Sequence, residues 1–338
     1  MKAAVITGPG SLEVVEKPTP KPGYREVLIK VKYCGICGSD LHAYDTGFLP
    51  VDLTIGHEFS GIIAETGPGC NDLTPGDRVT GNNLISCGKC PDCLRGKANY
   101  CREMLRLGIT GQGAMAEYIL MPAEEVFKLP GHLPLEHAAL AEPLSVGLHA
   151  FSKAGPEQVN NVLIIGAGTI GLVMVALMRY FAASNIIVIE PKPERLAVAE
   201  SLGANFLINP EEENSQQKID QITGKVGAEL VFECAGLPAT IQEACSLAGK
   251  GSQVVVLGIC YEPVEVNFLS LITREINVKP AFGKMHAEFK EAVRLIGEGK
   301  LDLLPLISGV IPFSSVTEGF ISSSRDKIKI LVAINGSS

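Results

Sequence analysis

The chain of 338 residues lacks a basic block: 29 Lys and Arg residues stand against 37 Asp and Glu residues, which gives a net charge of −8. Because the phosphates of nucleic acids and of anionic membranes are bound by clusters of Lys and Arg, this balance argues against both partners. A membrane-spanning segment is also missing, since the uncharged stretch 162–178 stops at Arg179, short of the ~20 apolar residues that a span needs. Its glycine-rich middle predicts a strand, a turn and a buried helix instead.

An export signal is missing as well. The first residues, MKAAVITGPGSLEV, contain one Lys and a short apolar run that Gly-Pro-Gly interrupts, unlike a signal peptide. We therefore expect a cytoplasmic protein whose ten cysteines are thiols or thiolates rather than disulfides. Four of them share one loop with the spacing C-x2-C-x2-C-x7-C: Cys87, Cys90, Cys93 and Cys101. Four thiolates can close a tetrahedron around zinc and leave no open position, which predicts a structural zinc site.

The chain changes its pattern near residue 160. Residues 1–150 are rich in turns and carry short β-branched runs such as 26–33 and 59–66, which predicts an irregular β-rich domain. Beyond residue 160, apolar strands alternate with helical segments, and this alternation predicts a six-stranded doubly wound parallel sheet. The expected strands cover residues 162–166, 185–190, 205–209, 228–235, 252–258 and 276–282. A helix over 286–300 and a strand over 327–334 follow.

A Gly-x-Gly-x-x-Gly motif ends the first of these strands and opens a helix, which is the context of a dinucleotide-binding turn. Glu190 closes the next strand, where its carboxylate could bind both ribose hydroxyls and would repel a 2′-phosphate. This favours NAD over NADP, although Lys192 nearby leaves NADP open. The alternative is a glycine turn that binds no cofactor. The candidate cofactor-binding residues are Gly166, Gly168, Thr169, Ile170, Gly171, Glu190 and Arg195, with Cys234, Ala235, Leu257 and Gly258 at two later strand ends.

A second set of metal-binding side chains lies in the first domain. Cys34 and Cys37 form a CxxC, but redox pairs of this kind accompany βαβ units, and the surrounding sequence is β-rich. Cys37, His57 and Glu58 are a better group, because a thiolate, an imidazole and a carboxylate are ligands that zinc accepts.

These motifs resemble, in their order along the chain, one family. Cys37-Gly-Ser-Asp, Gly56-His57-Glu58, Gly76-Asp77-Arg78-Val79, the four-cysteine loop, LAEPLSVG (140–147) and GAGTIG (166–171) are similar to the zinc-containing medium-chain alcohol dehydrogenases. The branch that they resemble most holds the polyol, butanediol and threonine dehydrogenases. The resemblance implies a GroES-like catalytic domain over 1–150 and 285–338 and a Rossmann domain over 151–284.

The resemblance also implies a catalytic zinc on Cys37 and His57, with Glu58 or Glu142 as third ligand. One thiolate and one carboxylate neutralise Zn²⁺ and leave a fourth position open, so we expect three protein ligands at a time, with exchange between the two carboxylates. Ser39 matches the family's proton-relay hydroxyl, and His42 would pass the proton onward. Asp40 would fix the tautomer of His57.

The implied activity is the NAD-dependent oxidation of a secondary alcohol or polyol to the ketone, with two zinc ions in each chain. We expect a homodimer or homotetramer that uses residues 276–282 as a contact. Phe282-Gly283-Lys284 replaces the Phe-Arg-Tyr typical of sorbitol enzymes, so that Lys284 raises the possibility of a phosphorylated substrate. An L-threonine 3-dehydrogenase and a non-enzymatic zinc- and dinucleotide-binding protein are the alternatives.

Overall fold

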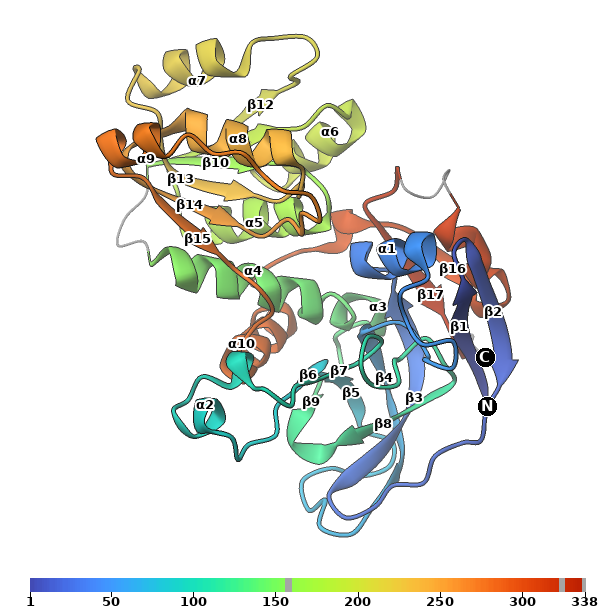
Figure 1. The fold of residues 1–338 in the computed structure, drawn as a ribbon. Coiled ribbons are helices and arrows are strands. Elements are labelled where there is room, and N and C mark those ends of the chain that lie inside the picture. The colour runs from blue at the N-terminus through green and yellow to red at the C-terminus, as the bar shows by residue number, and fades with distance from the viewer. Residues whose placement is uncertain (156–159, 322–325, 336–338) are drawn as a thin grey trace. The chain divides into compact units, whose positions relative to one another are not determined.

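The structure is a computed structural model that describes residues 1–155, 160–321 and 326–335 (Figure 1). The chain divides into two compact units. Unit 1 contains Met1–Ser145, Lys284–Lys300 and Ile307–Ser338, and unit 2 contains Val146–Gly283 and Leu301–Leu306.

Unit 1 is built on a mixed sheet with the strand order β16-β17-β3-β4-β5-β9, and β8 pairs with β3 beside this path. Its core is apolar and includes Ile29, Val31, Phe59 and Ile63, which lie on β3 and β4. The strands are β1 (Lys2–Gly8), β2 (Ser11–Glu16), β3 (Glu26–Gly35), β4 (Glu58–Thr66), β5 (Arg78–Gly81), β6 (Leu84–Ile85), β7 (Leu105–Arg106), β8 (Tyr118–Pro122), β9 (Val126–Lys128), β16 (Ile307–Pro312) and β17 (Lys329–Ala333). The short pairs β1-β2 and β6-β7 form separate sheets.

Short helices connect these strands. They are α1 (Gly38–Thr46), α2 (Pro91–Leu94), η1 (Ala98–Tyr100), η2 (Ala123–Glu125), α3 (Leu135–Ala138), α10 (His286–Gly297) and η4 (Phe313–Phe320). Helix α4 (Ala141–Ala154) crosses from unit 1 into unit 2 after Ser145. The sequence-based boundary at residue 150 also falls in this helix, because a continuous helix offers no break in the sequence.

Unit 2 contains a six-stranded parallel sheet with the order β12-β11-β10-β13-β14-β15, as expected for a doubly wound fold (Figure 1). Its strands are β10 (Asn161–Ile165), β11 (Asn185–Ile189), β12 (Phe206–Ile208), β13 (Ala228–Glu233), β14 (Ala248–Val256) and β15 (Asn277–Pro280). Its helices are α5 (Thr169–Tyr180), α6 (Pro193–Ser201), α7 (Ser215–Thr223), α8 (Pro238–Leu247), α9 (Phe268–Arg274) and η3 (Leu304–Leu306). Strand β10 is buried along its whole length, since helices cover both faces of such a sheet.

The predicted fold class is therefore confirmed, with differences at element ends. Strand β14 begins at Ala248, four residues before the expected start at 252, and β15 is shorter than the predicted 276–282. Residues 301–306 join unit 2, where Leu301, Leu303 and Leu306 are buried. No helix among the described residues is long and apolar enough to cross a membrane.

Candidate active site

Cys37, His57 and Glu58 come together at one end of the β3-β4 pair. Cys37 precedes helix α1, and Glu58 is the first residue of β4, where it pairs with Gly35 of β3. One ligand atom from each of the three residues lies within 4.8 Å of the others, and His57 and Glu58 are buried. Antiparallel pairing thus brings two segments, twenty residues apart in the sequence, into one potential metal site.

The buried Asp40 ties these two segments together. Its Oδ2 accepts a hydrogen bond from the N–H of Cys37 at 2.9 Å, and its Oδ1 accepts one from the N–H of Gly56 at 3.3 Å. The same Oδ1 lies 3.7 Å from Nδ1 of His57. A carboxylate beside Nδ1 favours the tautomer in which Nε2 is free to bind a ligand.

Each of two buried carboxylates has its own buried lysine. Glu58 accepts from Nζ of Lys329 at 2.8 and 2.6 Å, and this ammonium group also donates to the carbonyl oxygen of Ile36 at 2.9 Å. Glu142, in the first turn of α4, accepts from Nζ of Lys284. Lys284 is 2% exposed, so its charge is engaged within the protein.

The electric field at this site favours a cation. Burial alone would lower the pKa of His57, but Asp40, Cys37 and Glu142 outweigh burial and raise it to about 10. An environment that holds a proton so strongly at neutral pH would equally attract a metal ion, in exchange for that proton. Thiolate, imidazole and carboxylate ligands match zinc, so the residues present fit the metal that the sequence predicts.

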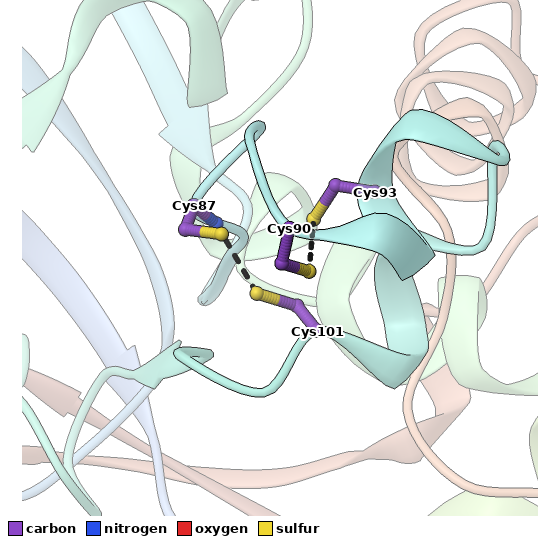
Figure 2. A group of neighbouring side chains, drawn as sticks. All are labelled: Cys87, Cys90, Cys93 and Cys101. Atoms are coloured by element: carbon purple, nitrogen blue, oxygen red, sulfur yellow. Dashed lines mark hydrogen bonds between the residues drawn. The ribbon is translucent and has the colours of Figure 1, made fainter.

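The four cysteines of the second predicted site also converge (Figure 2). Each places its Sγ within 4.8 Å of the other three, and all four are free thiols rather than disulfides. Hydrogen bonds from the backbone N–H groups of Cys93 and Arg102 lower the pKa of Cys90 to about 6, whereas desolvation and the bond to Cys90 raise the pKa of Cys93 to about 11. The thiolate that binds metal is therefore favoured at Cys90. Helix α2 turns the loop between Cys90 and Cys93, and the β6-β7 pair closes its base. This arrangement fits a closed tetrahedral zinc site.

Ser39 and His42 lie three residues apart on α1, and therefore on one face of the helix. The ring of His42 packs against that of Phe48, with centroids 5.7 Å apart.

In unit 2, the glycine-rich turn has the geometry of a dinucleotide site. Gly166 adopts a φ of 90°, and a Cβ on Gly171 would lie 1.8 Å from the carbonyl oxygen of Gly166, so neither position tolerates a side chain. Helix α5 begins at Thr169 and directs its N-terminus at the turn. Oε2 of Glu190 accepts from the N–H of Ala167 at 2.7 Å and lies 3.9 Å from Nη1 of Arg195.

Glu233 organises the two later strand ends. Its Oε1 accepts from the N–H groups of Ala235 and Gly236 at 2.9 and 2.8 Å, and from the hydroxyl of Thr240 at 2.7 Å. Its carbonyl oxygen accepts from the N–H groups of Leu257 and Gly258 at 2.8 and 3.0 Å. Sequence reasoning missed this residue, although a carboxylate within the apolar run AELVFECA was a signal of a buried polar role. The geometry within each unit fits a dinucleotide-binding protein with two metal sites.

Comparison with known proteins narrows this class. Residues 23–131 match the alcohol dehydrogenase GroES-like domain, and residues 169–298 match the zinc-binding dehydrogenase domain. The chain is 34% identical to a sorbitol dehydrogenase of Halalkalibacterium halodurans, over 98% of this chain and 99% of that one. It is also 34% identical to a galactitol 1-phosphate 5-dehydrogenase of Escherichia coli, over 96% and 97% of the two chains. The crystal structure of a zinc-binding dehydrogenase from Sinorhizobium meliloti, bound to NADP, matches with a TM-score of 0.92 at 32% identity, over 98% and 99% of the chains.

The chain therefore belongs to the zinc-binding dehydrogenases of the alcohol dehydrogenase family. It is an oxidoreductase that uses zinc and a nicotinamide dinucleotide to oxidise the CH–OH group of a secondary alcohol.

Proposed function

We propose that the chain oxidises a neutral polyol or diol rather than a polyol phosphate. The observation that carries this proposal is the pairing of Lys284 with Glu142 and with Oδ1 of Asn83, the latter at 2.5 Å. An ammonium group that is buried and neutralised in this way offers no free charge to a phosphate. The same pairing argues against the carboxylate of threonine as a substrate group for Lys284.

A substrate panel tests this proposal. NAD reduction is measured with sorbitol, 2,3-butanediol, galactitol 1-phosphate and L-threonine, each over a range of concentrations. We expect the largest kcat/KM for a neutral diol or polyol. A larger kcat/KM for the phosphate ester would refute the proposal, and a larger value for threonine would assign the chain to the threonine dehydrogenases.

We propose that Cys37, His57 and one carboxylate hold the catalytic zinc, and that Cys87, Cys90, Cys93 and Cys101 hold a structural zinc. When bound at the first site, zinc supplies Lewis acidity toward the substrate hydroxyl. Ser39 would accept the hydroxyl proton as it passes its own proton to His42, and Asp40 would keep His57 in the ligating tautomer. Metal analysis should find two zinc ions in each chain.

We propose that NAD is the preferred cofactor, with Gly166, Gly168, Thr169, Ile170 and Gly171 around its pyrophosphate. Glu190 supports this choice, because its buried carboxylate bonds to the turn and would face a 2′-phosphate with like charge. Arg195 lies beside the Glu190 carboxylate, so the carboxylate balances the positive charge of the arginine. The strand-end loops with Cys234, Ala235, Leu257 and Gly258 would receive the nicotinamide end of the cofactor.

We further propose a homodimer or homotetramer in a reducing, cytoplasmic setting. Strand β15 lies at the edge of its sheet with Val278 exposed, and nearby α9 exposes Phe268, Leu269 and Ile272. An exposed edge with apolar side chains is typical of a surface that pairs with another chain. Ten free cysteines support a reducing compartment. Light scattering on the purified protein gives the mass of the assembly.

A further inference from the structure

Glu233 is the last residue of strand β13 and is fully buried, at the point where the sheet of unit 2 reverses its strand order. It pairs with Ile165, the last residue of β10, and β10 and β13 are the two central strands from which the sheet grows in opposite directions. Open α/β sheets bind their ligands in the crevice outside the carboxyl ends of such a strand pair. The Glu233 carboxylate therefore lies at the edge of the sheet where the cofactor is expected.

The loops at this edge pack closely around the carboxylate. A Cβ on Gly258 would lie 2.7 Å from Oε2 of Glu233 and closer still to the backbone nitrogen of Gly236, so the two later strand-end loops touch each other at a pair of glycines. A Cβ on Gly166, in the glycine-rich turn, would lie 3.0 Å from Ala235. The turn and both later loops, which we propose to hold the cofactor, thus meet around one buried side chain.

The negative charge of Glu233 has no cationic side chain beside it. Three donors converge on its Oε1, namely the N–H groups of Ala235 and Gly236 and the hydroxyl of Thr240, and such bonds favour the ionised form. Thr240 lies in the first turn of α8, whose N-terminus also favours an anion. Among the described residues, Oε2 has no hydrogen-bond partner and Glu233 forms no ion pair, unlike the two buried carboxylates of unit 1.

A lone negative charge at this place distinguishes the two forms of a nicotinamide cofactor. The oxidised ring is a cation and the reduced ring is neutral, because the hydride that it accepts cancels the positive charge. At an effective dielectric constant of about 20, two unit charges about 10 Å apart interact with an energy equivalent to about tenfold or more in an equilibrium constant. The N-terminus of α8 offsets part of the Glu233 charge, which reduces the expected effect to about fivefold.

We propose that the buried charge of Glu233 favours the oxidised cofactor over the reduced one, and so supports binding of the form that accepts the hydride. This rests on the cofactor site proposed above. Because Glu233 is fully buried, it acts on the cofactor through its electric field and through the loops that it holds, as a positioning residue. If it served only to hold the loops, it would support both forms of the cofactor equally.

The test compares wild type with Glu233→Gln, which keeps the shape of the side chain and removes its charge. Calorimetry gives the dissociation constants of the zinc-loaded protein for NAD⁺, NADH and ADP-ribose. Glu233→Gln should raise the dissociation constant for NAD⁺ relative to that for NADH by about fivefold. ADP-ribose lacks the nicotinamide ring and should keep its wild-type affinity, which also shows that the variant is folded. An unchanged ratio of the NAD⁺ and NADH constants, or equal weakening of all three ligands, would overturn the proposal.

Two further variants separate charge from structure. Glu233→Met also removes the charge, without the amide N–H that Gln would bury against Gly258, and should shift the ratio of the NAD⁺ and NADH constants in the same direction. Thr240→Val is the matched control, because it removes one hydrogen bond to Oε1 and keeps the charge. The constants for NAD⁺ and NADH should change together in this variant. A shift in their ratio as large as that of Glu233→Gln would contradict a role of the charge.

Failure of the proposed function would look different. A wild-type protein that binds neither NAD⁺ nor NADP⁺ would refute the cofactor site itself. A wild-type protein that prefers NADP⁺ would refute only the choice of cofactor, and the ratio is then measured with NADP⁺ and NADPH, which carry the same nicotinamide ring.

Discussion

Replacing Lys329 with Met removes the ammonium group that balances Glu58 and leaves a side chain of similar length. Both partners are only 2% exposed in their side chains, and the ammonium makes three hydrogen bonds. Loss of one partner of a buried pair leaves an uncompensated charge and costs about 3–5 kcal/mol. We expect that loss in the free energy of unfolding of the metal-free protein.

The same substitution should cost less when zinc is bound. If Glu58 is a zinc ligand, the metal compensates the charge of the carboxylate that has lost its lysine partner. Bound zinc should therefore offset about half or more of the 3–5 kcal/mol destabilisation. The assay is chemical denaturation of wild type and Lys329→Met, each with saturating zinc and with a chelator. The quantity compared is the difference in the free energy of unfolding between wild type and Lys329→Met under each condition. The contribution of the structural zinc cancels in this difference.

Two further results decide the outcome. In a Glu58→Gln background, Lys329→Met should cost much less under both conditions, because no buried carboxylate remains unpaired. A cost for Lys329→Met alone that is the same with and without zinc would exclude Glu58 from the two candidates for the third ligand. In that case, Glu142 would be the carboxylate on the metal.

Cys37→Ser should abolish turnover in a folded protein and Cys101→Ser should lower the melting temperature, each leaving one zinc per chain by metal analysis. Glu190→Gln should reduce the kcat/KM preference for NAD over NADP by about tenfold or more, because facing like charges cost several kcal/mol; an unchanged ratio would remove Glu190 from cofactor choice. Burial lowers the pKa of Lys329, but Glu58 outweighs burial and raises it above the ordinary 10.5. The pair therefore stabilises the fold fully below pH 10.5 and loses this contribution as pH rises through the folded pKa. Above pH 10.5, the free energies of unfolding of wild type and Lys329→Met, measured by denaturation, should approach each other.

The sequence predicted well those features that leave a local pattern. Buried parallel strands such as β10 appear as continuous apolar runs, and the four-cysteine loop has the spacing of zinc ligands within one segment. It missed the partners of the two carboxylates, because Lys329 lies 271 residues from Glu58 and Lys284 lies 142 residues from Glu142. Lys329 at the start of the apolar strand KILVA signals a buried partner, but only the fold identifies it.

The lysines also explain how so many carboxylates can surround one zinc site. Cys37 as a thiolate, Asp40, Glu58 and Glu142 carry four negative charges, and Lys284 and Lys329 offset two of them. A divalent cation bound there would balance the remainder and would make the site neutral overall. Without the lysines the same ligands would leave an anionic centre, which holds metal tightly and acidifies a hydroxyl poorly. With zinc bound, the two buried ion pairs would act on the reactivity of the metal, and this role would account for their presence better than stability does, since buried pairs add little to stability.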